Sequence, residues 1–174
     1  MQRVLVAGST GAGKTTAARV LATALGLPHV EMDALWHGPG WVPRLEFDED
    51  VAAMLERGRW VTEYQYRTVK ASLLREAEAV VWLDHPFPLV AYRLLLRTLV
   101  RAVGRRPVYN GNVEQPSGWM RASHPLRIVF SREFTAKRRR TEQELAEAAR
   151  RGVEVVRLRG ATRASRWLAA QAAT

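Results

Sequence analysis

The chain has 174 residues, a length that suits one domain with a sizeable core. Its hydrophobic content of 47% and charged content of 25% are those of an ordinary globular protein. No run approaches the roughly 18 apolar residues of a membrane-spanning helix, and no signal-peptide pattern is present. The sequence has no cysteine, which excludes disulfides and thiolate metal sites. We therefore expect a cytoplasmic protein without a membrane partner.

The net charge of +10 is unevenly distributed along the chain. Residues 1–87 carry 9 Lys and Arg against 11 Asp and Glu, a net charge of −2. Residues 88–174 carry 18 against 6, a net charge of +12. A basic half of this kind is typical of a polyanionic partner, which could be nucleotide phosphates or nucleic acid, although a solvated basic surface has the same composition.

A glycine-rich run near the start of the chain separates a predicted strand over Val4–Ala7 from a predicted helix over Thr16–Leu25. This run fits G-x-x-x-x-G-K-[ST], the phosphate-binding P-loop, whose backbone N–H groups surround a phosphate chain at a helix N-terminus. Lys14 would reach the β- and γ-phosphates, and the Thr15 hydroxyl would hold Mg²⁺. The expected cofactors are ATP, or another nucleoside triphosphate, and Mg²⁺. The residues expected to bind the nucleotide are Gly8, Ser9, Thr10, Gly11, Ala12, Gly13, Lys14, Thr15 and Thr16.

Strand and helix patterns alternate through the rest of the chain. The further predicted strands are His29–Asp33, Trp60–Thr62, Ala79–Leu83 and Val153–Leu158. The further predicted helices run from an N-cap at Asp48 to about Arg57, over Val69–Glu76, from Pro86 to about Val103, over roughly Leu126–Arg151 and over Thr162–Ala170. This alternation indicates a three-layer α/β fold, with a five-stranded parallel sheet flanked by helices in a single domain over residues 1–174.

Two stretches are predicted as loops. One follows the second strand and contains Trp36 and Trp41, which could stack on the ring of a ligand but are more often loop packing. The other extends from Gly104 to about Ser123, where Gly, Pro, Asn and Ser occur with little periodicity. We expect this second stretch to be a loop or a mobile insert.

Acidic residues at strand ends are the candidate metal and acceptor groups, because ligands of parallel sheets bind at the carboxyl ends of the strands. Thr15 needs an acidic companion to hold Mg²⁺, and Glu63 and Asp84 each end an apolar strand. Asp84 could instead cap the helix that starts at Pro86. Asp33 faces the same rim, where it would position the phosphoryl acceptor and could act as its base.

Arginines supply the candidate cations for phosphoryl transfer. Arg93, Arg97 and Arg101 lie at i, i+4 and i+8 on one helix face, where a ligand anion would relieve their repulsion. A second cluster over residues 137–140 is followed by Glu142, Glu144 and Glu147, which could pair with it at helical spacing. A solvated basic stripe remains the alternative for both clusters.

Several motifs together resemble the bacterial DNA topology modulation (FlaR-like) family, small P-loop proteins related to adenylate kinase. The resemblance spans nearly the whole chain. It rests first on the P-loop and on Met32–Trp41 (MDALWHGPGW), which is similar to the family pattern Asp-x-x-(Phe/Trp)…Pro-Gly-Trp. The segment Trp60–Tyr66 (WVTEYQY) stands where the family has Trp-x-x-Asp-Gly-Asn-Tyr. Two shorter segments, Val81–Pro86 (VWLDHP) and Tyr92–Leu94 (YRL), also match.

The resemblance implies the fold of nucleoside-monophosphate kinases, with a core over about 1–103 and 152–174 and a lid insert over about 104–151. By the same resemblance, Arg97 and Arg101 look like lid-hinge arginines, and Arg132 and Arg138 like lid arginines that close over ATP. The chain departs from the family where Glu63-Tyr64-Gln65 replaces Asp-Gly-Asn. Tyr64 would block the close backbone approach that a glycine permits, so the acceptor differs or catalysis is weaker.

The function that the sequence favours is that of an ATP- and Mg²⁺-dependent phosphotransferase of the adenylate-kinase-like class. It would transfer the γ-phosphoryl group of ATP to a nucleoside, a nucleotide or another small hydroxyl compound. In this interpretation the residues that act in phosphoryl transfer are Lys14, Asp33, Arg97, Arg101, Arg132 and Arg138. One alternative is an ATP-binding regulator associated with nucleic acid, and another is a nucleotide-binding module with slow ATP hydrolysis.

Overall fold

The computed structural model describes residues 1–104, 110 and 130–173, with side chains left undescribed at 101–104 and 132. Its centre is a parallel sheet of five strands in the order β2-β3-β1-β4-β5. The strands are β1 (Arg3–Gly8), β2 (His29–Val30), β3 (Trp60–Glu63), β4 (Ala79–Leu83) and β5 (Glu154–Leu158). The α/β class and the five-stranded parallel sheet predicted from the sequence are thus confirmed.

The helices alternate with the strands along the chain. They are α1 (Lys14–Leu25), α2 (Met32–Trp36), the 3-10 turn η1 (Pro39–Trp41), α3 (Phe47–Glu56), α4 (Lys70–Glu76), α5 (Phe87–Gly104), α7 (Arg132–Arg150) and α8 (Ala161–Ala172). No helix in the described part of the chain is long and apolar enough to cross a bilayer.

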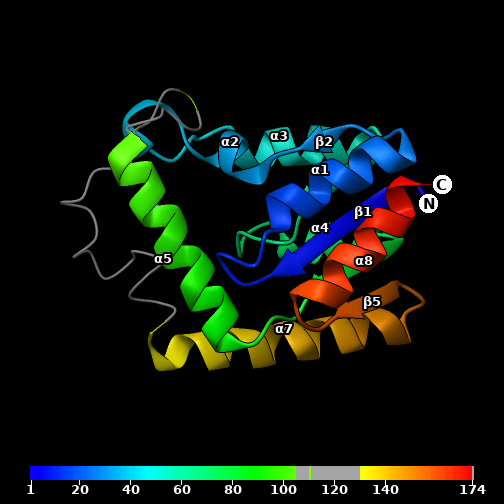
Figure 1. Ribbon diagram of the computed structural model, residues 1–174. Coiled ribbons are helices and arrows are strands. Elements are labelled where there is room, and N and C mark those ends of the chain that lie inside the picture. The colour runs from blue at the N-terminus through cyan, green and yellow to red at the C-terminus, as the bar shows by residue number, and fades with distance from the viewer. Residues whose placement is uncertain (105–109, 111–129, 174) are drawn as a thin grey trace.

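Two apolar clusters, one on each face of the sheet, account for the three layers. The inner positions of β1, Val4 through Ala7, are fully buried, as expected for a parallel strand covered on both faces. One cluster joins the sheet to α1 and α8, and the other joins it to α3, α4 and α7. Figure 1 shows α1 and α8 over the same side of β1, and α5 leaning away at the loop end of that strand.

The C-terminal half of α7 belongs to the second cluster. Leu145 and Ala148 are buried there against the sheet. The sequence places this helix within the predicted insert over residues 104–151, yet these two side chains pack in the core. The loop predicted over Gly104–Ser123 lies almost wholly outside the described residues, as does the start of the helix predicted from Leu126.

Two predicted boundaries are wrong. The second strand ends at Val30, and Met32 and Asp33 belong to α2. The Met32 N–H donates to the Glu63 carboxylate at 3.1 Å, so it is not available to extend this edge strand. Likewise, Asp48 does not cap α3, because that helix begins at Phe47 and Asp48 lies in its first turn.

Candidate active site

The P-loop connects the central strand β1 to α1. Gly11 and Gly13 adopt φ angles of +87° and +93°, which L side chains rarely adopt. The Ala12 N–H donates to the Ser9 carbonyl at 3.0 Å and closes the turn. The N-cap of α1 is Gly13, which has no side chain to cap the helix, so the N–H groups of the first turn and the positive end of the helix dipole face the loop. This backbone is suited to bind an anion.

Helix α5 supports the P-loop from the side. A Cβ atom on Gly11 would come within 3.2 Å of the Leu94 Cβ and of the Val90 carbonyl oxygen, so only glycine allows this close approach. Arg93 donates from Nη1 to the Ala12 carbonyl at 3.2 Å. The helix predicted to carry phosphate-binding arginines therefore also holds the loop in place.

Lys14 lies at the start of α1 and reaches back over the loop. Its Nζ is 3.4 Å from the Ser9 carbonyl oxygen. Burial lowers the pKa of Lys14 below its usual value, although the negative charges of Asp33 and Glu63 oppose this shift. Arg97 and Lys70 add positive charge that lowers the pKa further. The ammonium group is therefore desolvated among two carboxylates and two cations.

Glu63 ends β3 next to the P-loop, with its side chain only 1% exposed. One carboxylate oxygen lies 3.2 Å from His29 Nε2, and the other accepts from the Met32 N–H. Burial alone would raise the pKa of Glu63, but these hydrogen bonds, together with one from the Thr15 hydroxyl, hold it below its usual value. A buried carboxylate thus stays ionised beside Thr15.

Asp33 lies in the first turn of α2 and is oriented by two residues that follow β3. Its Oδ1 accepts from Gln65 Nε2 at 2.8 Å and from the Tyr66 hydroxyl at 2.5 Å. The Tyr66 ring stacks on Trp36, with centroids 4.9 Å apart, and Phe47 packs edge-on against both. Trp36 is therefore part of the packing that fixes Asp33.

Asp84 follows β4, and three arginines bind its buried carboxylate. Arg138 from α7 donates through Nε to Oδ1 at 2.6 Å and through Nη2 to Oδ2 at 2.9 Å. Arg157 Nε and Arg159 Nε lie 2.8 Å and 3.2 Å from Oδ2. Burial alone would raise the pKa of Asp84, but Arg138 and Arg157 hold it below its usual value. The sequence makes Asp84 a candidate to hold Mg²⁺ or to cap α5, but its carboxylate instead accepts hydrogen bonds from three arginines.

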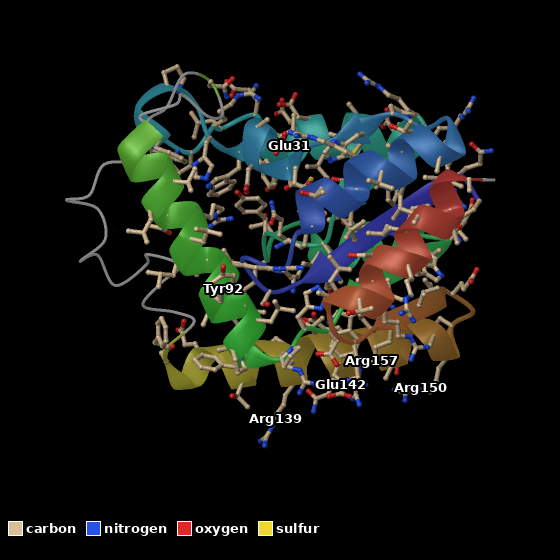
Figure 2. All side chains as sticks on the ribbon, in the orientation of Figure 1. Glu31, Tyr92, Arg139, Glu142, Arg150 and Arg157 are labelled. Atoms are coloured by element: carbon tan, nitrogen blue, oxygen red, sulfur yellow. The ribbon has the colours of Figure 1, made fainter. Side chains whose placement is uncertain are left out.

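Glu142 and Glu144, which follow the basic run of α7, have their hydrogen-bond partners outside this helix. Glu142 accepts from Arg157 of β5 at 2.7 Å, and these two side chains meet between α7 and β5 in Figure 2. Glu144 accepts from the Tyr64 hydroxyl at 2.9 Å and from Lys70 at 3.3 Å. Arg157 also lies over the Trp82 ring. These contacts join α7 to the sheet edge, and local sequence spacing carries no signal for them.

The other predicted arginines lie on α5 and α7. Arg97 is half-buried and close enough to Lys14 to affect its pKa. Arg101 lies on the last turns of α5 and Arg132 begins α7, but the side chains of both are outside the described part. The site thus brings Lys14, Asp33, Glu63 and Arg97 together, while Arg138 is engaged with Asp84.

A cavity of about 350 Å³ is lined by Lys14, and by Gln65 and Tyr66, which hydrogen-bond to Asp33. Its walls come from the first half of the P-loop, from the segment after β3, from the end of β4 and from α7. This volume is within the range of small-molecule sites, roughly 300–1,000 Å³.

No known family model matches the chain, and no curated protein matches it. Several solved structures are similar to it, among them three kinases. A gluconokinase from Sinorhizobium meliloti 1021 has 23% identity and a TM-score of 0.47 over 99% of this chain and 94% of that one. A sugar kinase from Janibacter sp. HTCC2649 has 18% identity and a TM-score of 0.45 over 97% and 93%. A shikimate kinase from Acinetobacter baumannii, in complex with shikimate, has 17% identity and a TM-score of 0.36 over 84% and 94%.

Proposed function

We propose that this chain is a phosphotransferase that uses ATP and Mg²⁺ and transfers the γ-phosphoryl group to a small acceptor. The observation that carries this proposal is the P-loop with an uncapped helix N-terminus, next to the desolvated Lys14 and the ionised Glu63. Phosphoryl transfer needs mainly positioning and charge stabilisation, and this arrangement supplies both.

In this proposal the P-loop amides bind the phosphate chain. Lys14 neutralises charge on the β- and γ-phosphates, and Arg97 adds a second cation from α5. Because the surroundings of Lys14 are largely desolvated, its attraction for a phosphate is stronger than it would be in water.

Thr15 and Glu63 are the residues that fit Mg²⁺. A hydroxyl and an ionised carboxylate in contact are the oxygen donors that this ion prefers, and Mg²⁺ commonly takes its remaining ligands from water and phosphates. When bound, the ion would offset charge on the β- and γ-phosphates. Asp84 is a poorer candidate, because three guanidinium groups already surround its carboxylate.

Asp33 is proposed to orient the acceptor hydroxyl and accept its proton. Gln65 and Tyr66 both donate to Oδ1, which leaves Oδ2 for the acceptor. The acceptor oxygen forms a bond to the γ-phosphorus while the bond from that phosphorus to the β–γ bridging oxygen breaks. The products are the phosphorylated acceptor and ADP, and the hydroxyl proton passes to Asp33.

The finer assignment is to the adenylate-kinase-like class, with a FlaR-like resemblance. Arg101, Arg132 and Arg138 would be arginines of a lid that closes over the nucleotide. Because Leu145 and Ala148 pack in the core, we propose that such a lid ends before them in α7.

The nucleic-acid alternative has little support, since Arg138 and Arg157 of the basic half are engaged with Asp84.

The test is ADP release from Mg-ATP with a panel of nucleosides, nucleotides, sugars and sugar acids, using wild type and Asp33→Asn. We expect one acceptor class to stimulate ADP release in wild type. The substitution is expected to lower the stimulated kcat by about a hundredfold or more, with little change in the KM for ATP. If no acceptor stimulates ADP release and the Asp33 substitution does not change its rate, the result contradicts phosphoryl transfer and favours slow ATP hydrolysis.

A further inference from the structure

The cavity beside the P-loop is strongly cationic. Six Lys and Arg side chains line it: Lys14, Arg67, Lys70, Lys137, Arg138 and Arg140. Among the described residues that line it, Asp84 is the only carboxylate, and that carboxylate is buried and bound by three arginines.

Three of the six cations pair with carboxylates, and a fourth is assigned to the nucleotide. Lys70 pairs with Glu144 at 3.3 Å, Lys137 with Glu133 at 3.6 Å, and Arg138 with Asp84. Lys14 is assigned to the nucleotide phosphates. Arg67 and Arg140 have no carboxylate partner within residues 1–104, 110 and 130–173, and both are exposed.

Arg67 and Arg140, which have no carboxylate partner in the described part of the chain, come from different walls of the cavity. Arg67 lies in the segment between β3 and α4, two residues after Gln65, which helps to orient Asp33. Arg140 lies on α7, which forms another wall of the cavity. Its neighbour Arg139 does not line the cavity, and Figure 2 shows it pointing away from the sheet. The chain therefore offers a matched control for Arg140.

The cavity adjoins the first half of the P-loop and Lys14. Its lining includes Ser9, Thr10 and Lys14 but not Thr15 or Thr16. Since the P-loop lysine reaches the β- and γ-phosphates, a molecule in this cavity would adjoin the transferred group. Unpaired guanidinium groups are suited to bind carboxylates or phosphates through two parallel hydrogen bonds.

We propose that the acceptor carries an acidic group, a carboxylate or a phosphate, and that Arg67 and Arg140 bind this group in the cavity. The inference rests on the proposed phosphotransfer and names the class of its acceptor. No carboxylate among the described residues pairs with Arg67 or Arg140, so an acidic group on the acceptor would supply a counter-charge that a neutral acceptor would not.

The test uses inorganic phosphate as the probe, in protein saturated with Mg²⁺ and the non-hydrolysable analogue AMPPNP so that the P-loop is filled. Phosphate binding is followed by ³¹P line broadening, and AMPPNP binding by calorimetry on the same samples. We expect Arg67→Ala and Arg140→Ala each to weaken phosphate binding about tenfold, which corresponds to about 1.4 kcal/mol, with Arg139→Ala unchanged. AMPPNP affinity should be the same in all three variants.

A parallel titration with ¹³C-labelled acetate distinguishes the two acid groups. Phosphate binding much tighter than acetate binding indicates a phosphorylated acceptor, and comparable affinities indicate a carboxylic acid. If AMPPNP binds but phosphate binding is absent, or is the same in all variants, the inference is overturned and the proposed function stands. If AMPPNP itself does not bind, the proposed function fails and takes this inference with it.

Discussion

Replacing Lys14 with alanine is expected to lower kcat for ADP release by roughly a hundred- to a thousandfold, the range for removal of one preorganised charge-stabilising group. The reason is the position of its ammonium, which is desolvated over the P-loop and close to Asp33 and Glu63. Such a group stabilises charge that develops on the transferred phosphoryl more strongly than an exposed lysine would. The measurement is steady-state ADP release with saturating Mg-ATP.

Lys137→Ala is a suitable control for this experiment. Lys137 is also a lysine near the cavity, but it is more than half exposed and pairs at 3.6 Å with an exposed glutamate. We expect its loss to change kcat severalfold at most. Equal effects of the two substitutions would mean that general positive charge, rather than the P-loop lysine, supports turnover.

Replacing Asp84 with asparagine is expected to lower the free energy of unfolding by about 1.5–3 kcal/mol, the range for losing hydrogen bonds to a charged group, because the arginines left behind are partly exposed to solvent. Arg138 and Arg157 both bind this carboxylate, and its side chain is 1% exposed. The loss should release α7 from the end of β4. For a chain of this length it should lower Tm by about 6 °C in thermal unfolding.

Lowering the pH should reduce the contribution of Asp84 to the free energy of unfolding of the wild type. Because the pKa of Asp84 is lower in the folded than in the unfolded chain, its stabilisation is complete above the unfolded value of about 3.8 and is lost as the pH falls through the folded value. The difference in the free energy of unfolding between wild type and Asp84→Asn, measured by urea unfolding, should therefore narrow as the pH falls from about 5 to about 3. Glu133→Gln, which removes an exposed pair, should change stability by about 1 kcal/mol or less at either pH. A constant difference for Asp84→Asn would contradict the role of its charge.

Local patterns in the sequence predict much of the fold. The buried strand over Ala79–Leu83 has the predicted bounds, and the P-loop lies between strand and helix as its motif requires. Apolar runs and glycine positions are local signals, so they can be interpreted without knowledge of distant residues. The carboxyl-end rule then correctly places Glu63 and Asp84 at one edge of the sheet.

The partners of these carboxylates could not be predicted in the same way. Arg138 and Arg157 are 54 and 73 residues from Asp84 along the chain, and they meet it only because α7 and β5 pack beside β4. The early end of β2 has a similar cause, since the Met32 N–H is bound by Glu63, 31 residues away.

Tyr64 shows how tertiary contacts alter an interpretation made from the sequence. As a replacement for glycine, it was expected to block the approach of a ligand to the backbone. In the structure it is 4% exposed, its hydroxyl donates to Glu144, and Lys70 lies 4.2 Å above its ring. Tyr64 therefore also connects the segment after β3 to α7, and it forms part of the cavity wall.

Calorimetric titration of wild type and Lys14→Ala with AMPPNP in the presence of Mg²⁺ tests the central claim most directly, because it depends on no acceptor. The account predicts saturable binding to wild type, with an affinity that falls at least about tenfold in the variant. Absence of heat at millimolar concentrations of this and the other common nucleotides, with a wild-type protein shown to be folded, would contradict it.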